Sequence, residues 1–122
     1  LDLPMVVMEK KRFLDRHDTT ESFQIIGDVK GKTAVIIDDV ISTGGTIIHS
    51  VQSLRDAGAS KIIVCAAHGI FAGEAINNIR NANVEKVIIT DTIAIPKEKQ
   101  LPQFETLSVA PLLAGAIGTI LR

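Results

Sequence analysis

Three short runs of apolar residues stand out along the chain, at residues 34–37, 62–67 and 87–89. Each run is apolar at consecutive positions rather than at alternate ones, which is typical of strands buried on both faces of a parallel sheet. The pattern therefore predicts three strands of this kind.

Between and after these runs, apolar residues recur with the spacing of a helix. One helical face covers residues 45–57 and ends at Gly58, a residue type that commonly terminates helices. A second helix is predicted at residues 73–82, and a third from about Ser108 into the apolar C-terminal stretch. Strands and helices that alternate across short connections predict an α/β fold with a mostly parallel sheet flanked by helices.

Two polar stretches interrupt this rhythm. Residues 10–20 are charged and without periodicity, and residues 95–104 contain Pro96 and Pro102. We expect both stretches to be long exposed loops, and long loops in compact domains are often functional.

Composition narrows the picture further. The 122 residues suffice for one domain, whose core must be aliphatic because the chain has no Trp or Tyr. A formal net charge of −1 indicates no nucleic-acid or membrane partner, and no apolar run approaches the roughly 20 residues of a membrane span. The single Cys65 cannot form an internal disulfide, so we expect a cytoplasmic protein. Since the chain starts at Leu1 without a methionine, we expect a fragment of a longer protein.

The segment after the first predicted strand carries the clearest chemical signal. Two carboxylates and two apolar residues are followed by hydroxyl and glycine residues that lead directly into a helix. Such a segment, at the carboxyl end of a parallel strand, lies where α/β sheets bind ligands. Backbone N–H groups, the helix N-terminus and hydroxyl groups together form a cradle for a phosphate dianion. We predict that this phosphate cradle consists of Ser42, Thr43, Gly44, Gly45 and Thr46.

The paired carboxylates, Asp38 and Asp39, would repel a phosphate if they faced it. We expect them to lie a short distance away and to accept hydrogen bonds from sugar hydroxyls, directly or beside a magnesium ion. Phosphate at one end and a diol at the other describe a ribose 5-phosphate. The sequence contains neither a Walker A loop nor a GxGxxG loop. The structural alternative is a Gly-Gly turn in which the Asp pair merely caps the helix.

Five motifs follow one another along nearly the whole chain. They are EKKRF at 9–13, IGDVKGKTAVIIDDVISTGGT at 26–46, AAHGIFAGEAINNI at 66–79, ITDTI at 89–93 and LSVAPLLAGAI at 107–117. In this order they resemble the ribose-phosphate pyrophosphokinase (PRPP synthetase) family of the type I phosphoribosyltransferase superfamily. HGIFAG and LSVAPLLA are not features of ordinary base phosphoribosyltransferases. The resemblance implies a type I phosphoribosyltransferase-like fold.

The resemblance also implies a reaction, in which MgATP transfers a diphosphoryl group to ribose 5-phosphate to give PRPP and AMP. It implies that residues 42–46 hold the 5-phosphate and that Asp38 and Asp39 bind ribose hydroxyls. It further implies that Lys10 and Arg12 act from a mobile catalytic loop, where cations can stabilise charge on the transferred group. Without the resemblance, the basic residues would be interpreted as a solvated charge run.

Some parts of the family's enzymes are expected to lie outside this chain. Those enzymes have two similar α/β halves, and residues 1–122 resemble the C-terminal one. The N-terminal half is expected to supply the ATP site, most ligands of Mg²⁺ and much of the interface of a homo-oligomer. We therefore expect the chain alone to be inactive. Ser42 stands where many members carry Asp, but a hydroxyl can still donate to phosphate.

Two other functions remain open. One is a non-catalytic regulatory subunit with this fold, although the presence of Lys10, Arg12 and both carboxylates argues against it. The other is a base phosphoribosyltransferase that consumes PRPP, for which the chain offers no recognisable base-binding segment.

Three further residues have simpler interpretations. We expect His68 to be a strand-end histidine satisfied by the backbone, and Cys65 to be a small buried hydrophobe. Asp91 either lines the ligand cleft or forms a plain turn, and the sequence leaves both readings open.

Overall fold

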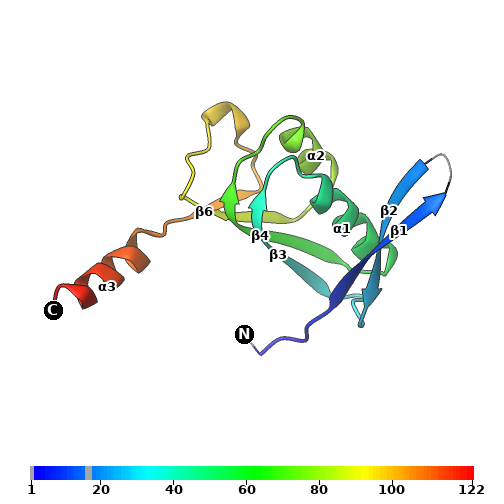
Figure 1. The fold of residues 1–122 in the computed structure, drawn as a ribbon, viewed down its shortest axis with the longest axis horizontal. Coiled ribbons are helices and arrows are strands. Elements are labelled where there is room, and N and C mark those ends of the chain that lie inside the picture. Colours follow the sequence, from blue (N-terminus) through cyan, green and yellow to red (C-terminus); the bar gives the residue numbers. More distant parts are fainter. Residues whose placement is uncertain (1, 16–17) are drawn as a thin grey trace.

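The computed structural model describes residues 2–15 and 18–122, with side chains at 2–9 and 23–122. A four-stranded parallel sheet with the order β3-β4-β5-β6 forms its centre (Figure 1). The strands are β3 (Thr33–Ile41), β4 (Lys61–Gly69), β5 (Lys86–Thr90) and β6 (Phe104–Leu107). Helix α1 (Gly45–Asp56) connects β3 to β4, and helix α2 (Ala75–Asn81) connects β4 to β5. The predicted α/β fold with a mostly parallel sheet is confirmed.

All three predicted strands are present, and each is longer than its apolar run. β3 continues through two carboxylates to Ile41, and β4 continues to Gly69. Strand pairing is a backbone property, so polar residues at a strand end can stay in the ladder. The two predicted helices between the strands are also confirmed, and Gly58 follows the end of α1 with a φ of 92°.

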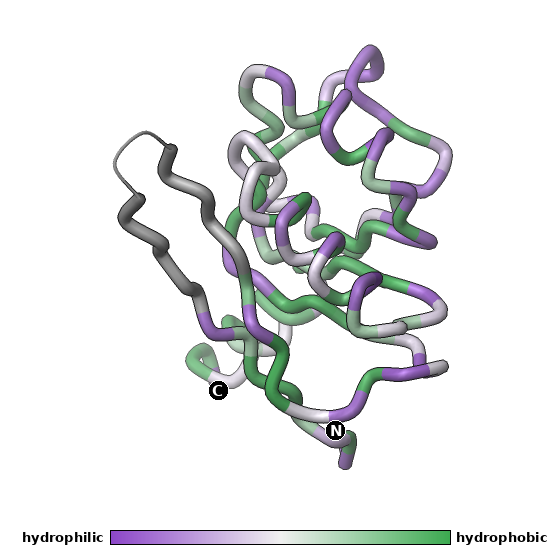
Figure 2. The backbone as a smooth tube through the Cα atoms, turned by 90° about the vertical axis from the view of Figure 1, so that its right-hand side faces the viewer, coloured by the Kyte–Doolittle hydropathy of each residue, from purple (hydrophilic) through white to green (hydrophobic). Residues whose placement is uncertain are grey.

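The helices cover only one face of the sheet. Burial alternates along β3, and on its open face Val35 is 48% exposed and Ile37 is 75% exposed. The prediction that β3 is buried on both faces is therefore wrong for the described chain. Hydrophobic stretches gather in the middle of the molecule in Figure 2. The core under α1 and α2 includes Ile47, Val51, Leu54, Ile62, Val64, Ala75, Ile79, Val87 and Ile89.

Within the predicted exposed loop at residues 10–20, residues 10–15 and 18–20 have strand backbone instead. β1 (Val7–Asp15) and β2 (Asp18–Ile26) pair antiparallel, with Val7 opposite Ile26, and β2 packs against α1. The loop prediction is wrong for these residues, because it assumed that a strand must show alternating apolar residues. A two-stranded ribbon is held by hydrogen bonds between its own strands and does not need an apolar face to pair.

The second predicted loop is largely confirmed. Residues 95–104 contain only the short 3₁₀ helix η1 (Lys97–Lys99) before β6 begins at Phe104. β6 itself was not predicted, because four residues are too few to show a period. Phe104 stacks on Phe71, with 5.0 Å between the ring centroids.

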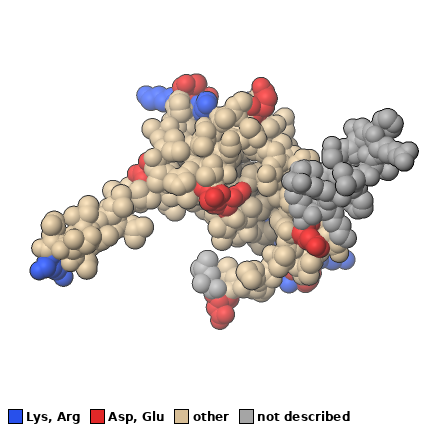
Figure 3. Space-filling view, in the orientation of Figure 1, with Lys and Arg blue, Asp and Glu red and all other residues tan. Residues whose placement is uncertain are grey.

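The predicted C-terminal helix is present as α3 (Ala110–Ile120). It extends away from the sheet in Figure 1, and all its residues are exposed. Figure 3 shows α3 as an uncharged rod with a basic group at its tip. Its exposed apolar side chains include Leu112, Leu113, Ile117 and Ile120. Of the helices in the described part of the chain, none is long and apolar enough to cross a membrane.

Candidate functional site

The connection between β3 and α1 lies at the carboxyl end of β3, where parallel sheets bind ligands. It borders a cavity of about 100 Å³ that is lined only by the end of β3, the connection and the first turn of α1. The lining residues are Asp38, Val40, Ile41, Ser42, Thr43, Gly44, Gly45, Thr46 and Ile47. The structure thus brings Asp38 and all five predicted cradle residues to one cavity.

Gly44 determines how the chain turns into α1. Its φ of 78° lies in the left-handed region, which glycine adopts without strain. Gly44 is also buried, and a Cβ placed on it would lie 3.6 Å from the Cα of Ala75 on α2. Within the described residues, no side chain caps α1 and no acidic residue occupies its first turn. The N–H groups of that turn are therefore available to an anion.

The segment after β4 braces this connection. The N–H groups of Ile70 and Phe71 donate to the carbonyl of Ile41, at 3.0 and 3.2 Å. The N–H of Ala72 donates to the carbonyl of Ser42 at 3.0 Å. All three donors belong to the HGIFAG motif, so this motif supports the phosphate cradle from outside. Sequence reasoning missed this role because main-chain donors leave no signal in the residue types.

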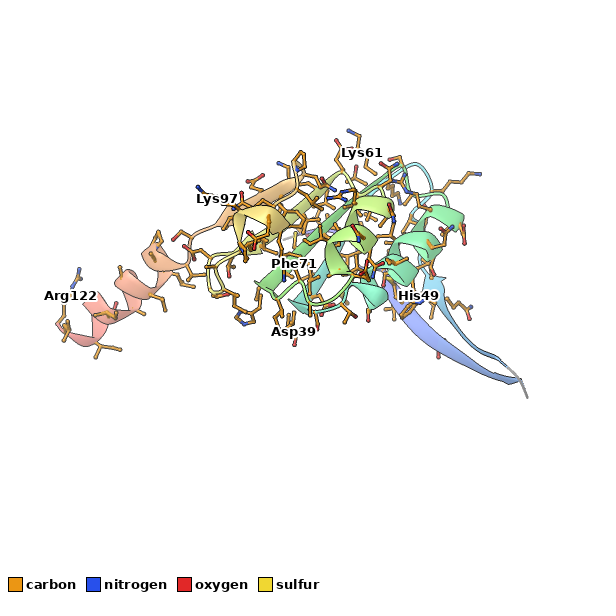
Figure 4. All side chains as sticks on the ribbon, turned by 90° about the horizontal axis from the view of Figure 1, so that it is seen from above. Asp39, His49, Lys61, Phe71, Lys97 and Arg122 are labelled. Carbon is orange, nitrogen blue, oxygen red and sulfur yellow. The ribbon has the colours of Figure 1, made fainter. Side chains whose placement is uncertain are left out.

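Asp38 and Asp39 lie within β3 rather than beyond it, so their side chains point to opposite faces of the sheet. Asp38 is half-buried on the face that carries the helices, and it lines the cavity. Asp39 is exposed, does not line the cavity, and lies at the periphery of the molecule in Figure 4. Only Asp38 is therefore beside the cradle, and the shared ribose-binding role of the pair stays a prediction.

The ladder between β3 and β4 is interrupted at Asp39. Asp38 pairs with Ala66 and Val40 pairs with His68, while Asp39 has no partner on β4. The N–H of Asp39 donates instead to the carboxylate of Asp38 at 2.8 Å, and the N–H of Val40 donates to that of Asp39 at 2.8 Å. Both carboxylates are thus oriented by the backbone before any ligand binds.

Lys10 and Arg12 belong to β1, which pairs with β2. The side chains of both residues are outside the part of the chain whose side chains are described, which is residues 2–9 and 23–122. Their predicted catalytic role therefore stays a prediction.

A second polar cluster lies at the carboxyl ends of the neighbouring strands. Nδ1 of His68 lies 2.7 Å from the hydroxyl of Thr92, which lies 2.9 Å from the hydroxyl of Thr90. Thr90 also donates to the carbonyl of Ala67 at 2.5 Å. The interpretation of His68 as satisfied by the backbone is wrong, because its partner is a side chain. The hydroxyls of β5 and its following turn thus tie the end of β4 in place.

Asp91 anchors the start of α3. Its carboxylate accepts a hydrogen bond from the N–H of Val109 at 2.9 Å, and its own N–H donates to the carbonyl of Leu107 at 3.0 Å. Hydrogen bonds from the Ser108 side chain and from the Val109 N–H lower the pKa of the Asp91 carboxyl below 3.8. Of the two interpretations left open by the sequence, the structure thus favours the turn.

The Asp91 carboxyl should accordingly titrate below pH 3.8. A carboxyl with a depressed folded pKa stabilises the fold above its ordinary pKa, and this contribution is lost as the pH falls through the folded value. An NMR titration that follows the Asp91 carboxyl and the Val109 amide should show both changing together. Asp91→Asn should remove that shared transition, and a midpoint at or above 3.8 would contradict the anchoring role.

Cys65 pairs with Ile37 of β3, whose side chain lies on the open face of the sheet. The Cys65 side chain is partly exposed, whereas the sequence predicted a buried one. Burial nevertheless raises the pKa of its thiol, which keeps the thiolate scarce at neutral pH. Among the residues with described side chains, no group of three or more His, Cys, Asp or Glu is arranged to hold a metal ion.

Residues 5–122 match the family described as the phosphoribosyl synthetase-associated domain. The chain belongs to this family. A ribose-phosphate pyrophosphokinase of Caldanaerobacter subterraneus subsp. tengcongensis is 42% identical over 117 residues, which cover 96% of this chain and 36% of the relative. Ribose-phosphate pyrophosphokinase 1 of Streptococcus pyogenes serotype M3 is 40% identical over 117 residues, with 96% and 37% covered. The chain thus spans about a third of the length of these curated relatives.

A solved structure shares the fold of this member of the phosphoribosyl synthetase-associated domain family. The crystal structure of phosphoribosylpyrophosphate synthetase from Mycobacterium smegmatis matches it with a TM-score of 0.78 and 42% sequence identity. The match covers 82% of this chain and 34% of that chain. The family resemblance drawn from the five sequence motifs is therefore supported by all three comparisons.

Proposed function

We propose that this chain is the ribose-5-phosphate-binding part of a ribose-phosphate diphosphokinase. In that reaction MgATP transfers its diphosphoryl group to the anomeric hydroxyl of ribose 5-phosphate, and the products are PRPP and AMP. The observation that carries the proposal is the cavity at the end of β3, which is lined by the phosphate cradle and by Asp38 together. Similarity to ribose-phosphate pyrophosphokinases over 96% of the chain supports the same substrate.

In the proposed site, the two ends of the sugar phosphate are recognised by opposite chemistry. The N–H groups at the start of α1 and the hydroxyls of Ser42, Thr43 and Thr46 donate to phosphate oxygens. The carboxylate of Asp38 accepts hydrogen bonds from ribose hydroxyls, and it lies on the strand side of the cradle, apart from the helix terminus. Fixing both ends holds the anomeric hydroxyl in one orientation for attack on the incoming diphosphoryl group.

Lys10 and Arg12 are proposed to supply the cations that stabilise charge on that group. The remaining machinery is proposed to lie outside this chain, which would correspond to the C-terminal half of the family's enzymes. The exposed apolar side chains on the open sheet face and on α3 support further protein contacts, including those of a homo-oligomer. Mg²⁺ is proposed as the cofactor, and most of its ligands are proposed to lie in that outside part.

We also propose that the protein is cytoplasmic and has no nucleic-acid or membrane partner. Because the ATP site is assigned to the missing part, the chain alone should not form AMP from ATP. AMP formation by the purified chain would contradict that assignment.

Isothermal titration calorimetry of the 122-residue chain tests the proposed substrate. Ribose 5-phosphate should bind at least about tenfold more tightly than ribose or inorganic phosphate, because each of these lacks one of the two recognised ends. Equal affinity for ribose 5-phosphate and inorganic phosphate would show that the carboxylates contribute nothing. No binding of any of the three would refute the site.

A further inference from the structure

Three successive carbonyl groups, at the end of β3 and in the β3–α1 connection, accept hydrogen bonds from residues 70–78. The carbonyls of Ile41 and Ser42 accept hydrogen bonds from main-chain N–H groups, and these donors do not depend on the identity of the side chains. The carbonyl of Thr43 accepts Nδ2 of Asn78 on α2 at 3.0 Å, across 35 positions of sequence. Among the described residues, Asn78 is thus the one donor in this set that depends on residue type.

The bond to Asn78 fixes the orientation of the Thr43–Gly44 peptide. In a trans peptide the C=O and the following N–H point in opposite directions, and the described backbone contains no cis peptide bond. Since Asn78 holds the carbonyl of Thr43 toward α2, the N–H of Gly44 points away from α2. The cavity is lined by residues of the 38–47 segment and by none of α2, so this direction leads toward the cavity.

Without a partner on the Thr43 carbonyl, this peptide would be free to rotate. A flip would change ψ of Thr43 and φ of Gly44, and glycine permits φ of either sign, so the backbone itself opposes a flip only weakly. A flipped peptide would present the carbonyl oxygen of Thr43 to the phosphate in place of an N–H donor. Asn78 lies close enough to prevent this by its hydrogen bond. A Cβ built on Gly44 would lie 3.6 Å from the Cβ of Asn78.

We propose that Asn78 is a positioning residue, which acts through the Thr43 carbonyl to aim the N–H of Gly44 at the 5-phosphate. The identity of the ligand rests on the proposed function, whereas the orientation of the peptide rests on the hydrogen bond alone. The two parts can therefore be tested separately.

The first measurement uses the ligand-free, isotope-labelled chain and compares Asn78→Ala with Asn77→Ala. Asn77 is the adjacent amide on α2, and its Nδ2 donates to Glu74 at 2.7 Å rather than to the cradle. Because an amide nitrogen shift responds to hydrogen bonding at the preceding carbonyl, Asn78→Ala should move the Gly44 resonance and Asn77→Ala should not. Asn78→Asp removes the donor with little change of volume, should move the resonance too, and decides the matter if Asn78→Ala does not fold.

The second measurement is calorimetric titration with ribose 5-phosphate. Asn78→Ala should bind about fivefold to tenfold more weakly, the equivalent of one lost hydrogen bond, while Asn77→Ala should bind as the unsubstituted chain does. An unmoved Gly44 resonance, or a moved resonance with unchanged affinity, overturns the positioning role. If the unsubstituted chain does not bind ribose 5-phosphate, the proposed function fails, and the Gly44 resonance still decides whether Asn78 sets the peptide.

Discussion

Ribose 5-phosphate binding should fall by more than about a hundredfold when Asp38 and Asp39 are both changed to alanine, since each hydrogen bond to a charged group contributes about 1.5–3 kcal/mol. The structure separates the two positions, because Asp38 lines the cavity and Asp39 does not. We therefore expect Asp38→Ala to cause most of the loss and Asp39→Ala a small part of it. Calorimetric titration of the two single variants and the double variant measures each share.

Asp56→Ala provides a matched control for these variants. Asp56 is an exposed carboxylate at the far end of α1 from the cradle, where it accepts a hydrogen bond from Gln52. Its removal should leave the affinity unchanged. Thermal unfolding of every variant is needed as well, because Asp38 and Asp39 also accept backbone N–H groups. Equal losses from the two single variants would show that strand alternation does not separate their roles, and an unaffected double variant would refute the site.

The meeting of residues 42–46 at one cavity was predictable from the sequence because it depends on local geometry. Residues 42–46 are contiguous between a strand and a helix, so their N–H groups and hydroxyls meet without help from distant segments. The direction of the carboxylates depends instead on where the strand ends. The apolar run stops at Ile37, but pairing with β4 continues to Ile41, and the two-residue period of the strand then separates Asp38 from Asp39.

Features that depend on distant segments could not be predicted in the same way. The main-chain donors at residues 70–72 and the amide of Asn78 meet the cradle only because β4 and α2 pack beside it. The apolar runs predicted strands buried on both faces, whereas Val35 and Ile37 are exposed. Whether an apolar face is covered depends on what packs against it, and the pattern of a single strand does not contain that information.

Gly69→Ala should lower the free energy of unfolding by about 3 kcal/mol. Overpacking a core typically destabilises a fold by about 1–3 kcal/mol, and a rigid site gives values at the upper end of this range. A Cβ on Gly69 would lie 2.9 Å from Cζ of Phe71 and closer still to Cε2. The ring has little room to move, because Phe71 is 1% exposed and stacks on Phe104. Its backbone is held as well, since its N–H donates to Ile41. Thermal melting should show a midpoint lower by about 10 °C.

Two comparisons isolate the ring of Phe71 as the cause. Gly115→Ala, on exposed α3 where a Cβ would meet nothing within 4 Å, should instead stabilise the helix by up to about 1 kcal/mol. In a Phe71→Ala background the added methyl group has no ring to meet, so Gly69→Ala should cost less than about 1 kcal/mol there. The same cost in both backgrounds would exclude the ring as the obstacle. Because Phe71 and its neighbours hold the carbonyls of the β3–α1 connection, Gly69→Ala should also weaken ribose 5-phosphate binding, which would link this packing contact to the shape of the cradle.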